Sequence, residues 1–320
     1  MNAPLAKRMA RSQRGVALIT AILIVALATI LATQIGFDSA LEQRRSAAIL
    51  SLDQAFQVAL GAEAWAAAYL KEDAENSQTD FPGEKWATPI PPIPIDGGEV
   101  EGLVEDMQGR FNLNNLITPQ GAIDPVAVQQ FRNLLTELQL EPKWADILAD
   151  WLDTDTQPQF PEGAEDNVYT GQTPPYRAAN GPITSSSELL ALPDFGVERY
   201  LKLKPYVTAL PVGTKLNVCT APGILIDAMN ESGTHEFGVD EASLAKQRTD
   251  KCFPTLQDLQ NAFHGQGADK ITQYMDEKTS YFRVTALVTI GTSQMTMYSL
   301  LRRDETTHLV RPVMRTLAAD

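Results

Sequence analysis

Carboxylates gather in one short stretch of the chain, and carboxylate oxygens are the ligands that hard divalent cations bind. Six of them fall within seventeen residues, at Asp150, Asp153, Asp155, Glu162, Glu165 and Asp166. Negative charges this close repel one another unless a cation neutralises them. Ca²⁺ takes six to eight oxygen ligands and tolerates irregular loop geometry. The local residues therefore predict either a calcium site or a solvated acidic loop without metal, and they leave both open.

The spacing of the first candidate ligands resembles an EF-hand but does not continue as one. Asp153, Asp155 and Gln157 match its first, third and fifth positions. Pro158 then stands where the sixth-position Gly belongs, and Ala164 stands where the twelfth-position Glu belongs. A cation here would be held by a loop of a different kind.

The two cysteines, Cys219 and Cys252, are candidates for a disulfide. In an oxidising compartment such a pair is expected to be joined. Closing a loop of about 34 residues stabilises a fold by about 3–4 kcal/mol on the chain-entropy model. Two separate buried thiols are the alternative, and neither arrangement indicates an activity.

Other kinds of chemistry find little support. The three histidines, His235, His264 and His308, are scattered without the spacing of metal ligands, and the chain has no G-x-S-x-G, P-loop or G-x-G-x-x-G motif. A hydrolase-type acid pair cannot be singled out among 40 Asp and Glu residues. The formal net charge of −14 opposes nucleic-acid binding, which needs Lys and Arg at phosphates. We therefore expect neither an enzyme nor a nucleic-acid-binding protein.

The N-terminal forty residues predict how the rest is positioned. Lys7, Arg8, Arg11 and Arg14 precede Gly15, and an uncharged stretch follows at 16–37. Its 22 residues would span about 33 Å as a helix, enough for a hydrocarbon core of about 30 Å. The cations before it are expected to stay on the cytoplasmic side. The pattern predicts a single-pass membrane protein with a cytoplasmic N-terminus and most of the chain on the opposite side of the membrane.

Beyond the membrane, the sequence predicts an α+β fold. Three- and four-residue apolar spacing extends one helix from about 16 to 72, and the proline-rich segment 76–98 is predicted to be a surface connector. Alternating residues predict strands within 99–113 (a pair joined at Gln108-Gly109) and within 279–315. The block between these strands is expected to be helical, with one helix capped by Asp124 and segments 194–205 and 216–229 forming paired short helices of SAM-like or helix-hairpin-helix type.

The sequence around Gly15, QRGVALIT, resembles the class III leader of type IV pilins and pseudopilins. The resemblance implies that a prepilin peptidase cleaves after Gly15 and that Val16 is then N-methylated. An uncleaved signal anchor is the alternative. Most members of that group carry Glu at the fifth mature position, where this chain has Thr20. A subunit with no neighbour stacked above it has no amine to neutralise, so it does not need this intramembrane carboxylate.

Residues 150–180, together with the segment KLNVCTAP at 215–222, resemble the signature of the type II secretion protein K family. Cys219 departs from the family's NVNTAP motif, which has Asn there. The resemblance covers essentially the whole chain and implies a pilin-like long helix on an antiparallel sheet, interrupted by a large all-α insertion. The implied organisation is a leader at 1–15, a membrane segment at 16–37, pilin-like parts at 38–113 and 279–320, and an inserted α-domain at 114–278.

The same resemblance carries functional expectations. It implies Ca²⁺ bound by Asp153, Asp155, Glu165 and Asp166, with Gln157 as a weaker ligand. It implies the minor pseudopilins I and J as partners, with exported proteins as a further class. The expected role is to nucleate and cap the pseudopilus at its tip during export of folded exoproteins across the outer membrane. A minor pilin of a type IV pilus, acting in assembly or adhesion, is the alternative.

Overall fold

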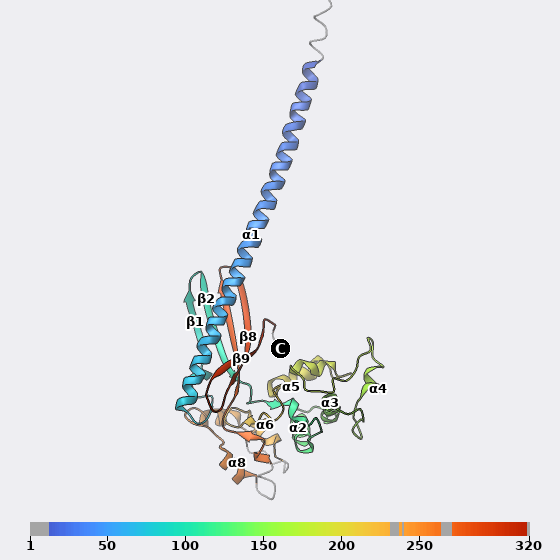
Figure 1. Cartoon of the computed structure of the whole chain (residues 1–320), viewed down its shortest axis with the longest axis vertical. Coiled ribbons are helices and arrows are strands. Elements are labelled where there is room, and N and C mark those ends of the chain that lie inside the picture. The colour runs from blue at the N-terminus through green and yellow to red at the C-terminus, as the bar shows by residue number, and fades with distance from the viewer. Residues whose placement is uncertain (1–12, 231–236, 239, 264–270, 319–320) are drawn as a thin grey trace, which may run out of the picture.

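The computed structural model describes residues 13–230, 237–238, 240–263 and 271–318 (Figure 1). Leader residues Lys7, Arg8 and Arg11 lie outside this part of the chain. A long helix, α1, leads into a sheet. A second, largely helical unit lies beyond the C-terminal end of α1 (Figure 1). We call this second unit the inserted domain; it comprises residues 107–280.

Helix α1 (Gln13–Asn76) is continuous, as expected because the sequence has no proline between Pro4 and Pro82. Among the described residues it is the one helix long and apolar enough to cross a bilayer. Residues 16–37 are exposed throughout, whereas Ala55, Ala59, Ala66 and Leu70 are buried against the sheet. Their spacing of four or seven residues places them on one face of the helix. The N-terminal half of α1 therefore does not pack on the rest of the described chain, whereas its C-terminal half packs on the sheet and stabilises it.

The sheet has five antiparallel strands in the order β1-β2-β7-β8-β9. Their bounds are β1 Ile90–Ile95, β2 Gly98–Asp106, β7 Tyr281–Ile290, β8 Ser293–Arg303 and β9 Val310–Thr316. Alternate residues of β7, from Phe282 to Ile290, are buried against α1, and the residues between them face away. The two-residue period predicted this strand correctly.

One buried charge on α1 ties the last strand to the helix. The carboxylate of Glu63, which is 5% exposed, accepts hydrogen bonds from Arg315 on β9 at 2.7 and 2.8 Å and from Ser299 on β8 at 2.6 Å. These charged contacts hold the pKa of Glu63 below its usual value although burial alone raises it. A buried carboxylate paired in this way positions the edge strand.

Two predictions for the segment around the first strands were wrong. Residues 76–98 are not only a connector, because they contain β1 and the short helix η1 (Lys85–Ala87). Proline is tolerated in β1 because it is an edge strand with one unpaired side. The segment after Gln108 does not return as a hairpin strand: β3 (Phe111–Asn112) pairs in parallel with β4 (Val207–Thr208), and η2 (Leu113–Leu116) follows.

The inserted domain replaces the loop of a β-hairpin. Strand β2 ends at Asp106, β7 begins at Tyr281, and Asp106 pairs with Phe282. The chain therefore leaves and re-enters the sheet at neighbouring points. The prediction assigned 38–113 to the pilin-like part, whereas Phe111 and Leu113 pack in the core of the inserted domain.

Short helices make up most of the inserted domain. They are α2 Pro125–Glu137, α3 Trp144–Leu152, α4 Asp166–Tyr169, η3 Ser186–Ala191, α5 Gly196–Leu203, η4 Lys204–Tyr206, α6 Gly223–Ala228, α7 Glu241–Gln247 and α8 Leu256–Ala262. The Asp124 side chain caps α2, as predicted, by accepting from the backbone of Val126 and Ala127.

The inserted domain has its own core and departs from the expectation in two details. Phe111 and Phe131 stack with ring centroids 5.4 Å apart inside that core. It is not purely helical, because β3–β4 and β5–β6 (Leu216–Asn217 with Met275–Asp276) form two-residue parallel ladders. Helix α6 packs mainly on α2, and α5 packs on η3 and η4, which differs from the predicted pairing of these two segments.

Candidate metal centre

Three of the predicted ligands converge at the end of α3 and the start of α4. Asp153 directly follows α3, Glu165 directly precedes α4, and Asp155 lies in the loop between them. One carboxylate oxygen from each lies within 4.8 Å of the others. Helix ends thus bring together residues that are up to twelve positions apart in the sequence.

Burial leaves oxygens of this group without partners. Asp153 is 2% exposed and Glu165 is 3% exposed, whereas Asp155 is exposed. Within the described part of the chain, Asp153 Oδ1 and both carboxylate oxygens of Glu165 accept no hydrogen bond. A buried carboxylate without donors is costly to keep ionised. The group is therefore arranged for a positive charge that the protein's own side chains do not supply.

The electrostatics follow from this arrangement. Burial, and then the charge of Asp155, raises the pKa of Asp153 to about 6. Burial, followed by the charges of Asp150, Asp153 and Asp155, raises the pKa of Glu165 to about 7. Such shifts mark carboxylates whose ionised form is disfavoured by low dielectric and by like charges. A bound cation would reverse both effects.

The other two predicted ligands lie differently. The carboxylate of Asp166 accepts a hydrogen bond from the backbone N–H of Ala178 at 3.0 Å and lies 3.8 Å from Arg177 Nε. Gln157 is exposed, and its backbone N–H donates to Asp155 Oδ1 at 2.7 Å. Neither side chain belongs to the converging group of three carboxylates.

Asp150 lies beside the converging group and was not among the predicted ligands. It is fully buried, and its carboxylate accepts from the backbone N–H of Gln159 at 3.0 and 3.2 Å. Burial raises its pKa to about 6. The signal for it was present in the sequence, because Asp150 and Asp153 are three residues apart and share a helix face.

The donor set suits calcium. Three carboxylates supply hard oxygen ligands, and the two buried ones have oxygens that nothing else in the described chain engages. Trp151 and Tyr169 pack behind the loop with ring centroids 4.9 Å apart, so the backbone that carries the ligands is supported. A cation here would hold two helix ends and a loop together.

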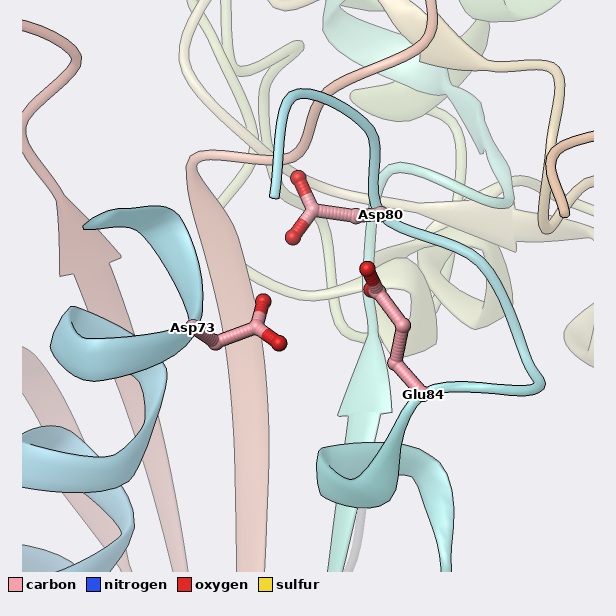
Figure 2. Close-up of side chains that lie close together, drawn as sticks. All are labelled: Asp73, Asp80 and Glu84. Atoms are coloured by element: carbon pink, nitrogen blue, oxygen red, sulfur yellow. The ribbon is translucent and has the colours of Figure 1, made fainter. Parts of the chain in front are cut away.

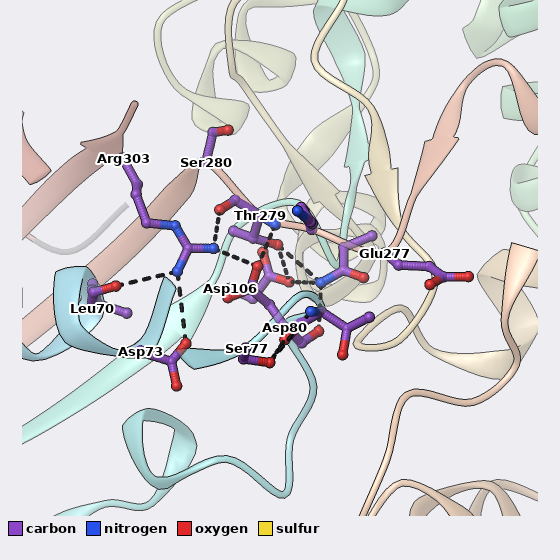
Figure 3. Close-up of polar contacts among 12 residues, drawn as sticks. Leu70, Asp73, Ser77, Asp80, Asp106, Glu277, Thr279, Ser280 and Arg303 are labelled. Atoms are coloured by element: carbon purple, nitrogen blue, oxygen red, sulfur yellow. Dashed lines mark hydrogen bonds and ion pairs between the residues drawn. The ribbon is translucent and has the colours of Figure 1, made fainter. Parts of the chain in front are cut away.

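A second acidic group, Asp73, Asp80 and Glu84, meets between α1, the following loop and η1 (Figure 2). Its charge is compensated only in part from within the protein. The Arg303 guanidinium contacts Asp80 and lies 3.7 Å from Asp73 (Figure 3). The Glu84 carboxylate accepts from Trp86 Nε1 at 2.7 Å and from the backbone N–H of Phe81 at 3.1 Å. Asp73 Oδ2 accepts no hydrogen bond within the described chain, and burial, then the charges of Glu84 and Asp80, raises the pKa of Asp73 to about 7. Unlike the group at Asp153, this one includes an arginine partner.

The remaining predicted sites lie in two places. Cys219 and Cys252 form a disulfide that closes a separation of 33 residues inside the inserted domain, which confirms the pairing. Gly15, Val16 and Thr20 lie on the continuous helix α1. The Thr20 hydroxyl donates to the carbonyl oxygen of Ala17 at 3.0 Å, so its polar group is satisfied by its own helix.

Known proteins with similar sequences give the family. A family model described as type II secretion system (T2SS), protein K matches residues 109–212. The type II secretion system protein K of Pseudomonas aeruginosa is 38% identical over 92% of this chain and 90% of its own length. Those of Aeromonas hydrophila and Pectobacterium carotovorum are 30% and 32% identical over 94% and 90% of this chain, and over 96% and 92% of their own. The chain belongs to the type II secretion system protein K family.

A solved structure supports the architecture of this protein K. A chain in the GspK-GspI-GspJ complex from enterotoxigenic Escherichia coli superposes with a TM-score of 0.75 and is 24% identical. The match covers 86% of this chain and all of that chain. At this identity the similarity establishes the fold, namely a long N-terminal helix on an antiparallel sheet with an additional helical unit.

Proposed function

We propose that this chain is the minor pseudopilin at the tip of the type II secretion pseudopilus, where it nucleates and caps the fibre during export of folded exoproteins. The observation that carries the proposal is the place of the inserted domain. It lies beyond the end of α1 and of the sheet, on the side away from the membrane-spanning half of α1 (Figure 1). A subunit stacked further from the membrane would have to occupy the same space.

The membrane segment supports the same position. A carboxylate in hydrocarbon is costly unless it is paired, and in a fibre its partner would be the N-terminal amine of the subunit above. Thr20 needs no such partner, because its hydroxyl bonds within α1. A subunit that nothing follows can therefore dispense with the charge.

Processing of this chain is proposed to follow the pattern of its leader. A prepilin peptidase would cleave after Gly15 on the cytoplasmic side, and Val16 would then be methylated. The apolar part of α1 would remain as a single-pass anchor in the inner membrane, with the sheet and inserted domain in the periplasm. A periplasmic location also suits the Cys219–Cys252 disulfide, which an oxidising compartment preserves.

Pseudopilins I and J are the proposed partners at the tip. The solved relative is a complex of GspK with GspI and GspJ, and that complex motivates the assignment. We propose that the corresponding subunits of the same organism bind this chain.

Calcium is proposed as a structural ion at Asp153, Asp155 and Glu165. It would neutralise three carboxylates and lock the ends of α3 and α4 to the loop between them. Gln157, through its side chain or a carbonyl oxygen, and Asp166 remain predicted additional ligands. Asp166 would have to turn its Oδ2 toward the group, because its Oδ1 accepts from the backbone N–H of Ala178. Backbone carbonyls and water would complete the oxygen shell.

A deletion strain tests the secretion role. Loss of this gene should retain exoproteins in the periplasm, and a plasmid copy should restore export. Normal export with lost twitching or adhesion would instead identify a minor pilin of a type IV pilus.

A labelled inserted domain tests the tip position. Gold label should mark one end of each overassembled fibre, and label repeated along the shaft would refute capping. Thr20→Glu should reduce fibre number and export, whereas Thr20→Ser should leave both unchanged. Full export by the Thr20→Glu variant would contradict the support drawn from Thr20. The tip position would then be supported only by the size and place of the inserted domain.

A further inference from the structure

The face of the sheet that points away from α1 carries two arginines on a single carboxylate. Glu105 of β2 and Arg283 of β7 are directly paired across the strands and face the same side. Arg283 Nη2 lies 2.7 Å from Glu105 Oε2, and Arg110 Nη2 lies 3.0 Å from Glu105 Oε1. Two guanidinium groups on one carboxylate leave a positive charge in excess.

This excess charge is held in a poorly solvated position. The side chains of Arg110 and Arg283 are each 19% exposed, and that of Glu105 is 25% exposed. Burial, followed by the neighbouring charge of Arg283, lowers the pKa of Arg110. The charges of Glu105 and Asp106 offset this only in part, and a further anion beside the two arginines would relieve the remaining cost.

Both arginines open onto a small cleft between the sheet and the inserted domain. Its volume is about 40 Å³, and its described lining includes Lys204 as a third cation and no acidic residue. The lining also holds polar hydroxyl groups and apolar side chains, contributed by Thr184, Ser185, Ser186, Tyr298, Leu300 and Met314. A water needs about 10–15 Å³ measured in this way, so the cleft encloses room for a carboxylate and a water, and a larger group would lie at its rim, where Met314 is exposed.

We infer that this cleft binds a carboxylate side chain of a partner protein, an Asp or Glu with an apolar neighbour in its sequence. The planar fork of an arginine matches a carboxylate in two parallel hydrogen bonds. Leu300 and Met314 give the apolar neighbour a surface to contact. The site is unusual for this chain, since its formal net charge is −14 and most anions would be repelled elsewhere.

The site is separate from the proposed metal centre in elements and in charge. It is lined by β7, β8 and β9, the loop after β2 and the segments around η3 and η4, whereas the metal centre lies between α3 and α4. Carboxylate binding in this cleft depends neither on calcium nor on the capping role, so it can be refuted without affecting those two proposals.

Two peptides test the inference on the unmodified protein. The full-length chain in detergent micelles is titrated by calorimetry with acetyl-Ala-Leu-Glu-Leu-Ala-amide and with the matching Gln peptide. The Glu peptide should bind about tenfold more tightly than the Gln peptide, because it alone gains the charged hydrogen bonds, and its affinity should fall with added salt. Equal affinity of the two peptides would overturn the inference.

Variants of opposite sign sharpen the test. Arg283→Gln should weaken the Glu peptide by about tenfold, because Glu105 then neutralises Arg110 alone. Glu105→Gln should tighten it, because the internal competitor is gone. Arg199→Gln is the matched control, since it removes one arginine that pairs with Glu141 outside the cleft, and it should leave the affinity unchanged. Weaker binding of the Glu peptide by Glu105→Gln would refute the inference. A wild-type protein that binds inorganic phosphate but not the Glu peptide would refute it as well.

Discussion

Glu165→Gln should change the stability of the inserted domain in opposite directions with and without calcium. In chelator the wild-type chain keeps a buried, unpartnered carboxylate beside Asp153 and Asp155, and the amide removes that charge. In calcium the wild-type chain gains the metal, and the variant has lost a ligand. The variant should therefore be the more stable protein in chelator and the less stable one in calcium.

The magnitudes follow from the structure. Burial and the neighbouring carboxylates raise the pKa of Glu165 from 4.5 to about 7, and each unit corresponds to about 1.4 kcal/mol. At pH 8 the amide should therefore stabilise the calcium-free protein by up to about 3 kcal/mol. Calcium at about 100 times its dissociation constant stabilises the wild type by about 2.7 kcal/mol. A unit of 150–250 residues shifts its melting temperature by about 2–4 °C per kcal/mol, so both changes are measurable.

The assay is thermal unfolding of the full-length chain in micelles at pH 8, in calcium and in chelator. Glu162→Gln is the matched control, because Glu162 is exposed in the same loop and does not belong to the converging group. That control should keep the whole calcium-dependent shift. An equal calcium shift in wild type and Glu165→Gln, or a Glu165→Gln protein that is less stable in chelator, would refute the reasoning.

Three further outcomes are expected. Gly15→Ala should leave the leader attached, seen as a larger band on a gel, and a band of normal size would exclude this cleavage site. Burial, then the charges of Glu84 and Asp80, raises the pKa of Asp73 to about 7. Stability should therefore fall as pH rises from about 4 to 7, and Asp73→Asn should raise the melting temperature at pH 8 but not at pH 4; equal gains at both would contradict this sign. Cys252→Ser should cost about 3–4 kcal/mol of unfolding free energy in denaturant titrations, and an unchanged midpoint would show that the bridge does not stabilise the fold.

Local patterning predicted the regular elements of the fold and failed where pairing decides the structure. Alternation in β7 and the proline-free run of α1 are properties of neighbouring residues, so the sequence was enough. Strand β1 was missed because its prolines argue against a strand until one knows that it forms the edge of the sheet. Residues 111–112 have strand character, but their partner is β4, almost a hundred positions later.

The candidate site shows the same division. Asp153 and Asp155 follow one helix end, so their spacing alone brought them together as candidates. Glu165 and Asp166 are neighbours in sequence, and only the start of α4 decides that Glu165 points into the group while Asp166 bonds to Ala178. Asp150 was counted in the acidic stretch, but the ligand set came from the family resemblance and did not include it. The structure places Asp150 in the last turn of α3, beside Asp153.

Capping requires an inserted domain that cannot swing aside, and the junction between the two units supplies the restraint. Asp106, at the last position of β2, accepts hydrogen bonds from Thr279 at 2.7 Å, from Asn217 at 2.8 Å and from Thr220 (Figure 3). All three donors belong to the inserted domain, and Thr279 lies two residues before β7, so the buried carboxylate at the end of β2 joins the points where the chain leaves and re-enters the sheet. All three side chains donate to the carboxylate of Asp106. Such donors stabilise its ionised form, although burial raises its pKa to about 6. A domain on a flexible tether could yield its place to another subunit, so the proposed capping role needs the fixed position that these bonds give to the inserted domain.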